Sequence, residues 1–198
     1  MTEVLLMLLC LDLTAAAAQL FAGTLVCSAP GCDGILGPWG HARFRSVRGG
    51  DAYRPRRGRC RSCRRTHVVG WAHSYPRRVD HVDVVAQALL GAAGGLGHSK
   101  VAALVDRPAS TVRDWIRRAR ENSESVRVTA TRLVHAIDPV AYRLDPTGTA
   151  LGDMLDAAGR AALASTLRFG PSDEGIWQRV LVITRAAILA PPRPRSIT

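Results

Sequence analysis

The sequence predicts an α+β protein, mostly α, in which a small cysteine-rich β unit precedes a helical part. Three observations lead to this fold class. Two close cysteine pairs enclose strand-like segments, apolar residues recur at helical spacing from residue 80 onward, and the apolar stripes after residue 120 are helical as well. We expect four regions: residues 1–75 with a strand, a helix and the β unit, residues 76–122 with three helices, residues 123–190 with further helices, and a disordered tail over residues 191–198.

The positive charge of the chain is concentrated in two neighbouring segments. The formal net charge is +11, and residues 41–78 alone hold twelve arginines against one aspartate. Residues 98–120 hold six basic and two acidic residues, whereas residues 121–198 are nearly balanced. A clustered basic surface is typical of proteins that bind a polyanion. Nucleic acid is the expected partner and a membrane surface is the alternative.

The first expected element is the apolar run over residues 4–11. It has the composition of a signal-peptide core, but no basic segment precedes it and Asp12 ends it, so we expect neither export nor a membrane span. We interpret it as a buried strand or the start of a helix, with Cys10 as a core thiol. Thr14 is the expected N-cap of a helix over residues 15–22, and Gly23 suits its C-terminal end. The expected location is cytoplasmic, and nucleoid-associated when the chain is bound to DNA.

Two cysteine pairs follow with the spacing of metal knuckles. Cys27 and Cys32 form a C-x₄-C pair, and Cys60 and Cys63 form a C-x₂-C pair. Each pair places two thiolates on one side of a tight turn, and two such turns complete the closed tetrahedral shell that structural Zn²⁺ prefers. Five cysteines are an awkward number for a secreted disulfide framework, although two disulfides or unpaired buried thiols remain alternatives. His41 or His67 could replace one thiolate.

The segments around the second pair are strand-like and predict a zinc ribbon of short antiparallel strands. We expect strands over residues 39–47 and 53–59, joined by Gly49 and Gly50, and over residues 66–71. Such a ribbon is too small to bury a large core, so the metal would contribute on the order of 10 kcal/mol to folding. Its arginines are the expected phosphate contacts, and a merely soluble basic face is the alternative. They are Arg43, Arg45, Arg54, Arg56, Arg57, Arg64 and Arg65.

The segment after the ribbon predicts a three-helix helix-turn-helix unit. Apolar residues recur at helical spacing from Asp80 onward, and a second stripe lies in residues 98–105. Asp106 lies where the connecting turn needs a left-handed residue, and Ser110 is the expected N-cap of the last helix. An ordinary helical hairpin with a solvated charged face is the alternative.

The expected recognition helix covers residues 110–120. Val112, Trp115, Ile116 and Ala119 recur at i, i+3, i+4 and i+7, which gives the helix one apolar face for a small core. The opposite face is polar and basic, and we expect it to enter the DNA major groove. Its expected DNA-binding residues are Ser110, Thr111, Arg113, Asp114, Arg117, Arg118 and Arg120.

The remaining sequence is less informative. A polar break is expected over residues 121–124, followed by helices over residues 126–137, 151–167 and 176–189. Helices of this kind commonly pack on a neighbour or pair two protomers, so a homodimer through them is one expectation.

The order of these motifs resembles that of a known family. The segments WGHAR, CRSCRRTH and RPASTVRDWIRRAR, taken in this order, look like a family of small uncharacterised proteins from high-GC bacteria in which a zinc ribbon precedes a helix-turn-helix. The same part, from about Cys27 to Arg120, is similar to the N-terminal DNA-binding part of some insertion-sequence transposases. The C-x₄-C pair departs from the commoner C-x₂-C. The resemblance implies zinc and DNA, and no reaction.

The sequence therefore favours a sequence-specific, double-stranded DNA-binding protein with structural Zn²⁺ and no enzymatic activity. The three-carboxylate domain of a transposase has no room after residue 120. A tyrosine recombinase would need a nucleophilic tyrosine with an arginine and histidine cluster, and Arg143 and His135 lie near Tyr142 in the sequence only as often as chance composition gives. No small-molecule substrate is indicated. One alternative is a mobile-element protein, as a transposase accessory factor or remnant. The other is RNA binding through the ribbon, for which the sequence shows no exposed aromatic platform.

Overall fold

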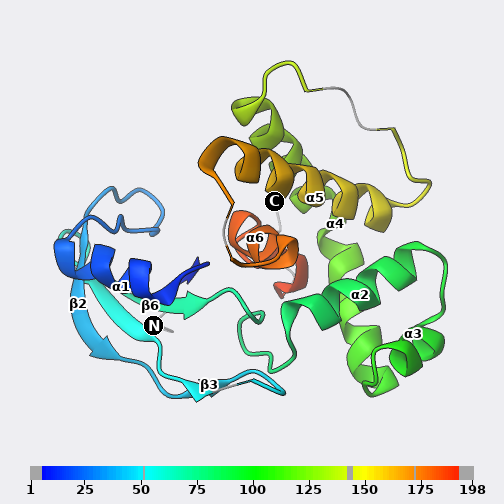
Figure 1. The fold of residues 1–198 in the computed structure, drawn as a ribbon, viewed down its shortest axis with the longest axis horizontal. Coiled ribbons are helices and arrows are strands. Elements are labelled where there is room, and N and C mark those ends of the chain that lie inside the picture. Colours follow the sequence, from blue (N-terminus) through cyan, green and yellow to red (C-terminus); the bar gives the residue numbers. More distant parts are fainter. Residues whose placement is uncertain (1–5, 51, 142–144, 172, 192–198) are drawn as a thin grey trace, which may run out of the picture. The chain divides into compact units, whose positions relative to one another are not determined.

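The chain divides into two compact units, Met1–Asp80 and His81–Thr198, in a computed structural model that describes residues 6–50, 52–141, 145–171 and 173–191 (Figure 1). The described residues are mixed α/β with more helix than strand, as predicted. Unit 1 contains the six described strands and helix α1, and unit 2 contains helices α2 to α6. The C-terminal tail expected to be disordered lies outside the described residues from 192 onward, as does Tyr142.

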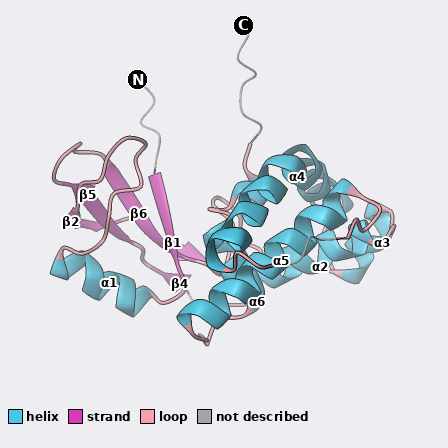
Figure 2. Cartoon of the chain, turned by 90° about the horizontal axis from the view of Figure 1, so that it is seen from above, coloured by secondary structure: helices cyan, strands magenta, loops and turns pink. Residues whose placement is uncertain are grey.

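Unit 1 is organised on a four-stranded sheet. Its order is β1 (Leu6–Cys10), β6 (Thr66–Trp71), β5 (Arg56–Cys60) and β2 (Leu36–His41) (Figure 2). The pairs β2–β5 and β5–β6 are antiparallel, but β1 pairs with β6 in parallel. The apolar run near the N-terminus is thus a strand, one of the two expected forms. The strands around the second cysteine pair are antiparallel as predicted, whereas nothing in the sequence predicted the parallel pairing of β1. The reason is that β1 joins the sheet next to a strand far away in the sequence, and periodicity does not reveal such a pairing.

Two predicted strands of unit 1 are interrupted. β2 ends at His41 after a register shift, with Gly40 at φ 76°, and β3 (Arg45–Ser46) pairs separately with β4 (Ala52–Tyr53). On the returning side, Pro55 separates β4 from β5 because proline has no backbone N–H for the ladder. Between these two strand pairs the Ala42 N–H donates to the Pro55 carbonyl at 2.8 Å.

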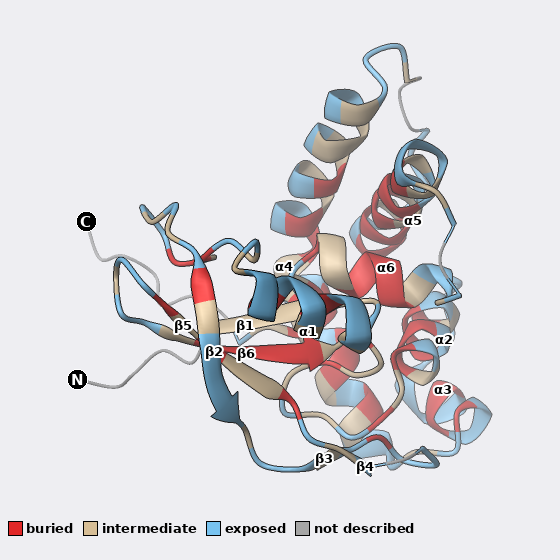
Figure 3. Cartoon of the chain, turned by 60° about the vertical axis from the view of Figure 1, so that its left-hand side comes forward, coloured by how far each residue is buried: buried red, intermediate tan, exposed pale blue. Residues whose placement is uncertain are grey.

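Helix α1 (Leu13–Ala22) packs on this sheet. Its N-cap is Asp12, whose Oδ1 accepts from the backbone N–H groups of Thr14 and Ala15 at 2.7 and 3.0 Å, so the prediction that Thr14 caps it was wrong. Its C-terminal end at Gly23, with φ 68°, is confirmed. Leu20 of α1 is buried together with Leu36 of β2 and Cys60 of β5, whereas much of the visible surface of α1 is exposed (Figure 3). A β-carbon on Gly58 would lie 2.9 Å from the Leu20 Cδ1 atom, so glycine lets the helix approach β5 closely.

Unit 2 is entirely helical among its described residues. Its helices are α2 (Val82–Ala93), α3 (His98–Leu104), α4 (Ala109–Ile137), α5 (Ala150–Phe169) and α6 (Ile176–Ile183), followed by the 3₁₀ turn η1 (Ala187–Leu189). Trp115 of α4 is fully buried, and α5 packs against α4. The Asn122 side chain donates to the carbonyls of Ile188 and Ala190, at 3.2 and 3.0 Å, and ties η1 to α4. No helix in the described part of the chain combines the length and apolarity needed to cross a membrane.

Helix α4 corrects two predictions. It begins after Pro108 without a side-chain cap, so Ser110 lies in its first turn and is not the N-cap. It then continues through residues 121–124, where a polar break was expected, and ends at Ile137. The buried residues explain the continuity, because the inward stripe of Ala119 continues at helical spacing through Ser123 and Val126. The left-handed residue expected at Asp106 is confirmed, with φ 51°.

Candidate metal centre and basic surfaces

The four paired cysteines meet at one point of unit 1. Their Sγ atoms all lie within 4.8 Å of one another, and the Cys27–Cys63 and Cys32–Cys60 sulfur pairs are each 3.7 Å apart. All are free thiols. A tetrahedral ion with metal–sulfur bonds of about 2.3 Å needs sulfur atoms about 3.8 Å apart. The cluster therefore has the dimensions of a site that could hold a metal ion.

The backbone around the cysteines supports negative charge on sulfur. The Ala29 N–H donates to Cys27 Sγ and the Cys63 N–H donates to Cys60 Sγ, each at 3.4 Å. The second turn closes at Arg64, whose N–H donates to the Cys60 carbonyl at 3.1 Å, and its positive φ of 61° turns the chain so that the Arg65 carbonyl accepts from the Cys60 N–H at 2.9 Å. Amide donors favour a thiolate over a thiol. The chain thus presents its sulfur atoms as anionic ligands.

The thiols differ in how readily they ionise without a cation. Burial raises the pKa of Cys27 to about 12, although the Ala29 amide opposes this. Burial also opposes ionisation of Cys60, but the amides of Cys63 and Ser62 and the neighbouring thiols lower its pKa to about 6. Four thiolates at this spacing repel one another. A bound cation supplies the positive charge that allows all of them to ionise.

His67 is part of this site as a hydrogen-bonding residue. It is fully buried on β6, with Nε2 3.2 Å from Cys27 Sγ and Nδ1 3.3 Å from Ser28 Oγ. A thiolate can only accept, so when Cys27 binds a metal the His67 Nε2–H donates to it and Nδ1 accepts from Ser28. Of the two histidines considered as substitute ligands, His41 is exposed on β2 and lies outside the cluster.

Gly34 is a residue of the site that sequence reasoning missed. A β-carbon there would lie 2.8 Å from Cys60 Sγ and 2.5 Å from Ser62 Oγ. Real β-carbons do not approach other atoms so closely, so only glycine lets this loop pass the cluster. A glycine two residues after Cys32 is visible in the sequence, but only the packing shows that a side chain at this position would collide with Cys60 and Ser62.

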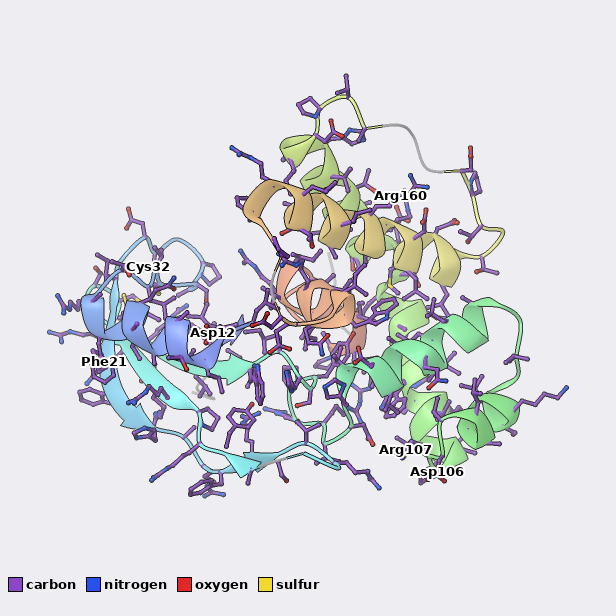
Figure 4. All side chains as sticks on the ribbon, viewed as in Figure 1. Asp12, Phe21, Cys32, Asp106, Arg107 and Arg160 are labelled. Carbon is purple, nitrogen blue, oxygen red and sulfur yellow. The ribbon has the colours of Figure 1, made fainter. Side chains whose placement is uncertain are left out.

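The cluster is continuous with the hydrophobic core of unit 1. Cys27 and Cys60 are buried together with Leu20, Ala29 and Leu36, and the other two cysteines pack against this group. Figure 4 marks Cys32 in the segment between α1 and β2. Any ion held here would connect the two knuckles to the core that α1 covers.

The predicted recognition residues lie on the outer side of α4. Ser110, Arg113, Arg117 and Arg120 are exposed, whereas the apolar residues of the same helical segment are buried. Figure 4 marks Asp106 and Arg107 in the turn that leads into α4. The outer side of residues 110–120 is therefore accessible, and its half-buried members are Thr111, Asp114 and Arg118.

Two of these arginines are engaged with acidic residues of the same helix. Arg117 donates to Asp114 at 2.7 Å and to Glu121 at 2.8 Å, and Arg118 Nε lies 2.9 Å from the Asp114 carboxylate. Asp114 therefore orients two guanidinium groups along α4. Sequence reasoning placed all of these residues on one face but did not identify these ion pairs.

The predicted phosphate contacts of unit 1 are all at least partly accessible. Arg43, Arg54, Arg64 and Arg65 are exposed, and Arg45, Arg56 and Arg57 are half-buried. Aromatic rings accompany two of them, since the guanidinium of Arg54 lies over Phe44 and that of Arg56 over Phe21. The expectation that the ribbon exposes no aromatic surface was wrong, because Phe21, Trp39 and Phe44 are all exposed.

A hollow of about 560 Å³ lies within unit 2, lined by residues of α2, α5 and α6 and the segment before α5. Its wall is largely apolar, with Leu90, Leu155 and Trp177 among its members. The charged pair Asp156 and Arg160 at this hollow is 3.4 Å apart, so each group neutralises the other. The cysteine cluster and the basic surfaces are the sites with the more specific chemistry, and we take them as the candidate sites.

Comparisons with family models, with curated proteins and with solved structures found no match to this chain. The functional interpretation therefore depends on the geometry of the residues themselves.

Proposed function

We propose that this chain is a DNA-binding protein that reads double-stranded DNA with the N-terminal half of α4 and carries a structural zinc ion in the four-cysteine cluster. The observation that carries the proposal is the accessible basic side of α4 above a buried apolar side. Val112, Trp115 and Ala119 are completely buried, while Arg113 and Arg120 of the same turns are exposed.

The helices before this surface fit a helix-turn-helix. The seven-residue α3 ends at Leu104, and only residues 105–108 separate it from α4. The left-handed Asp106 provides the sharp turn, and Arg107 Nη1 donates to the Asp106 carbonyl at 2.6 Å. In such a unit the second helix enters the major groove with its N-terminal residues on base edges. Arg113 is then the best placed residue for a bidentate contact to guanine.

Zinc is the ion that this ligand set supports best. Four thiolates in a closed tetrahedral shell are typical of structural zinc sites. The shell has hydrogen bonds from backbone amides and from His67, and it adjoins the core of a small unit that buries few large apolar side chains. In this proposal unit 1 is a zinc ribbon whose arginines contact DNA phosphates.

The test is a comparison of variants on a duplex selected from a random pool and on an unrelated duplex. Arg113→Ala should reduce discrimination between the two duplexes by roughly 5- to 150-fold, which corresponds to about 1–3 kcal/mol per lost base contact. Arg117→Ala should reduce it less, because its guanidinium is engaged by Asp114 and Glu121. Arg132→Ala, an exposed arginine on the C-terminal half of α4, is the matched control.

Equal losses on the two duplexes for Arg113→Ala would exclude a base contact by this residue. If neither Arg113→Ala nor Arg117→Ala changed the affinity for either duplex, as expected of the control Arg132→Ala, α4 would be rejected as the DNA-binding element. Arginine variants of unit 1, such as Arg65→Ala, should instead weaken binding to both duplexes by the same factor and reduce the salt dependence of binding.

A further inference from the structure

Unit 1 exposes three large aromatic rings, and each has an arginine guanidinium over it. Phe21, Trp39 and Phe44 are 59%, 49% and 69% exposed. The Cζ atoms of Arg56, Arg59 and Arg54, respectively, lie 4.9, 4.6 and 5.6 Å from the ring centroids. We call these six residues the aromatic–arginine surface.

Stability of the unit does not account for this exposure. Burying a phenylalanine side chain contributes more to stability than an exposed cation–π pair does. The three exposed rings therefore lose more stabilisation by not being buried than they gain from their cation–π pairs with arginine. Figure 4 marks Phe21, which lies next to the C-terminal residue of α1. A ring in such a position is available to a binding partner.

The surface follows the edge of the sheet. Trp39 lies on β2, which is the last strand of the four-stranded sheet, and Phe44 follows three residues after β2 ends at His41. Arg59 and Arg56 are three residues apart on β5, so they point to opposite faces of the sheet. The Phe21–Arg56 and Trp39–Arg59 pairs therefore lie on opposite faces of the sheet, and a flexible chain would have to bend around the edge strand β2 to contact both.

The arginines of this surface are held in place. Arg59 Nε donates to the Arg64 carbonyl at 3.1 Å, and Arg54 Nε donates to the Ala42 carbonyl at 3.3 Å. The acidic residues around them are few. Asp12 caps α1 and Asp80 pairs with Arg48 at 3.2 Å, which leaves Asp33 as the third carboxylate among the described residues of unit 1. The partner should therefore carry negative charge as well as flat rings.

We propose that the aromatic–arginine surface binds single-stranded nucleic acid, with unpaired bases stacked on Trp39, Phe44 and Phe21 and the arginines on the backbone phosphates. Stacked unpaired bases combine a flat apolar ring with a polyanionic chain, and proteins bind them on exposed aromatic residues in a positively charged surface. Paired bases in a duplex are covered by their neighbours and cannot stack on these rings. This site lies in unit 1, so it does not depend on the reading of duplex DNA by α4 in unit 2.

The test uses the full chain and four labelled probes of equal length: single-stranded DNA, single-stranded RNA, an abasic DNA strand and a duplex. Trp39→Ala and Phe44→Ala should each weaken binding to the base-containing single strands by roughly 5- to 150-fold, the equivalent of one lost stacked base. Binding to the abasic strand and to the duplex should stay close to that of the unchanged protein. A stronger effect on DNA or on RNA identifies which backbone the surface prefers.

Phe169→Ala is the matched control. Phe169 is 73% exposed and has Arg168 5.9 Å from its ring, but it lies on α5 in unit 2, a helix that holds two aspartates and two arginines. Its loss should not affect single-strand binding. Trp39→Phe keeps a ring at the key position and should restore most of the affinity that Trp39→Ala loses, and circular dichroism checks that each variant is folded.

Two results would overturn the proposal. One is single-strand affinity that survives the Trp39→Ala, Phe44→Ala double substitution. The other is an equal loss on the abasic strand, which would mean that only phosphates are bound. Either result would leave duplex recognition by α4 untouched, and a failure of the Arg113→Ala test would leave this site untouched.

Discussion

The residues closest to the cysteine cluster show how much one atom matters at this site. Cys60 Sγ receives the Cys63 amide on one side and passes Gly34 on another, where a β-carbon would be only 2.8 Å away. His67 is buried against Cys27 and Ser28. These three contacts come from different segments of unit 1, and together they determine where the sulfur atoms can lie.

At this scale the sharpest prediction concerns Gly34→Ala. The new methyl group should displace Cys60 Sγ or Ser62 and reduce metal affinity by roughly 10- to 100-fold, the range seen when the surroundings of a ligand are disturbed. The measurement is competition for the metal against a chromophoric chelator.

Gly37→Ala is the control for this substitution. Its β-carbon would meet Arg61 Nε at 3.5 Å, an ordinary contact with a flexible side chain, so metal affinity should not change. If Gly34→Ala bound metal as tightly as Gly37→Ala, the close approach at Gly34 would have no role in holding the site.

Helix α4 connects the predicted DNA-reading surface with the C-terminal helices. It runs without interruption over 29 residues, and its buried side contacts α3 near the start and α5 further on. Residues 121–124, which are rich in polar side chains, lie in the middle of it. The helix continues there because Ser123 faces inward and its hydroxyl donates to the Ala119 carbonyl at 2.8 Å.

The continuity of α4 predicts that Glu121→Pro is strongly destabilising. Proline removes one backbone hydrogen bond and clashes with the preceding turn, which costs about 3 kcal/mol or more inside a helix. Glu121→Ala, the control, loses only the exposed ion pair with Arg117, so its free energy of unfolding should stay close to that of the unchanged protein. Denaturant unfolding gives both values. Similar free energies of unfolding for the two variants would mean that residues 121–124 form a break in solution.

At the scale of the whole molecule, the two units depend on different sources of stability. Unit 2 buries Trp115, Leu155 and Leu181 among many apolar side chains. Unit 1 has a smaller core, into which the cysteine cluster is built. A structural zinc ion contributes on the order of 10–16 kcal/mol in small zinc domains, so unit 1 should depend on it far more than unit 2.

We therefore expect metal removal to separate the two units. A strong chelator should release one zinc ion per chain and unfold unit 1, while most of the helical far-UV circular dichroism remains, because α2 to α6 all lie in unit 2. Metal analysis and circular dichroism on the same sample measure both effects. Loss of the whole helical signal, or protein purified without metal, would contradict this assignment.

Much of the secondary structure could be predicted from local sequence. The strand over residues 66–71 has the predicted bounds, α5 begins and ends within two residues of the predicted helix over residues 151–167, and α2 begins two residues after Asp80, where the helical pattern starts. Periodicity and turn residues act over a few neighbouring positions, so they can be read from the chain directly. The start of α4 was harder, because Ser110 had the right side chain for a cap but the wrong backbone position.

By itself the sequence determined which residues carry the chemistry: four cysteines in two turns, a block of arginines, and a helix with one apolar and one basic side. Only the tertiary structure decided what surrounds them, including the parallel β1–β6 pair, His67 beside Cys27, the close approach at Gly34 and the rings under the arginines. The physical reason is range. Spacing along the chain expresses local geometry, whereas these contacts join segments tens of residues apart whose register depends on how the whole core packs.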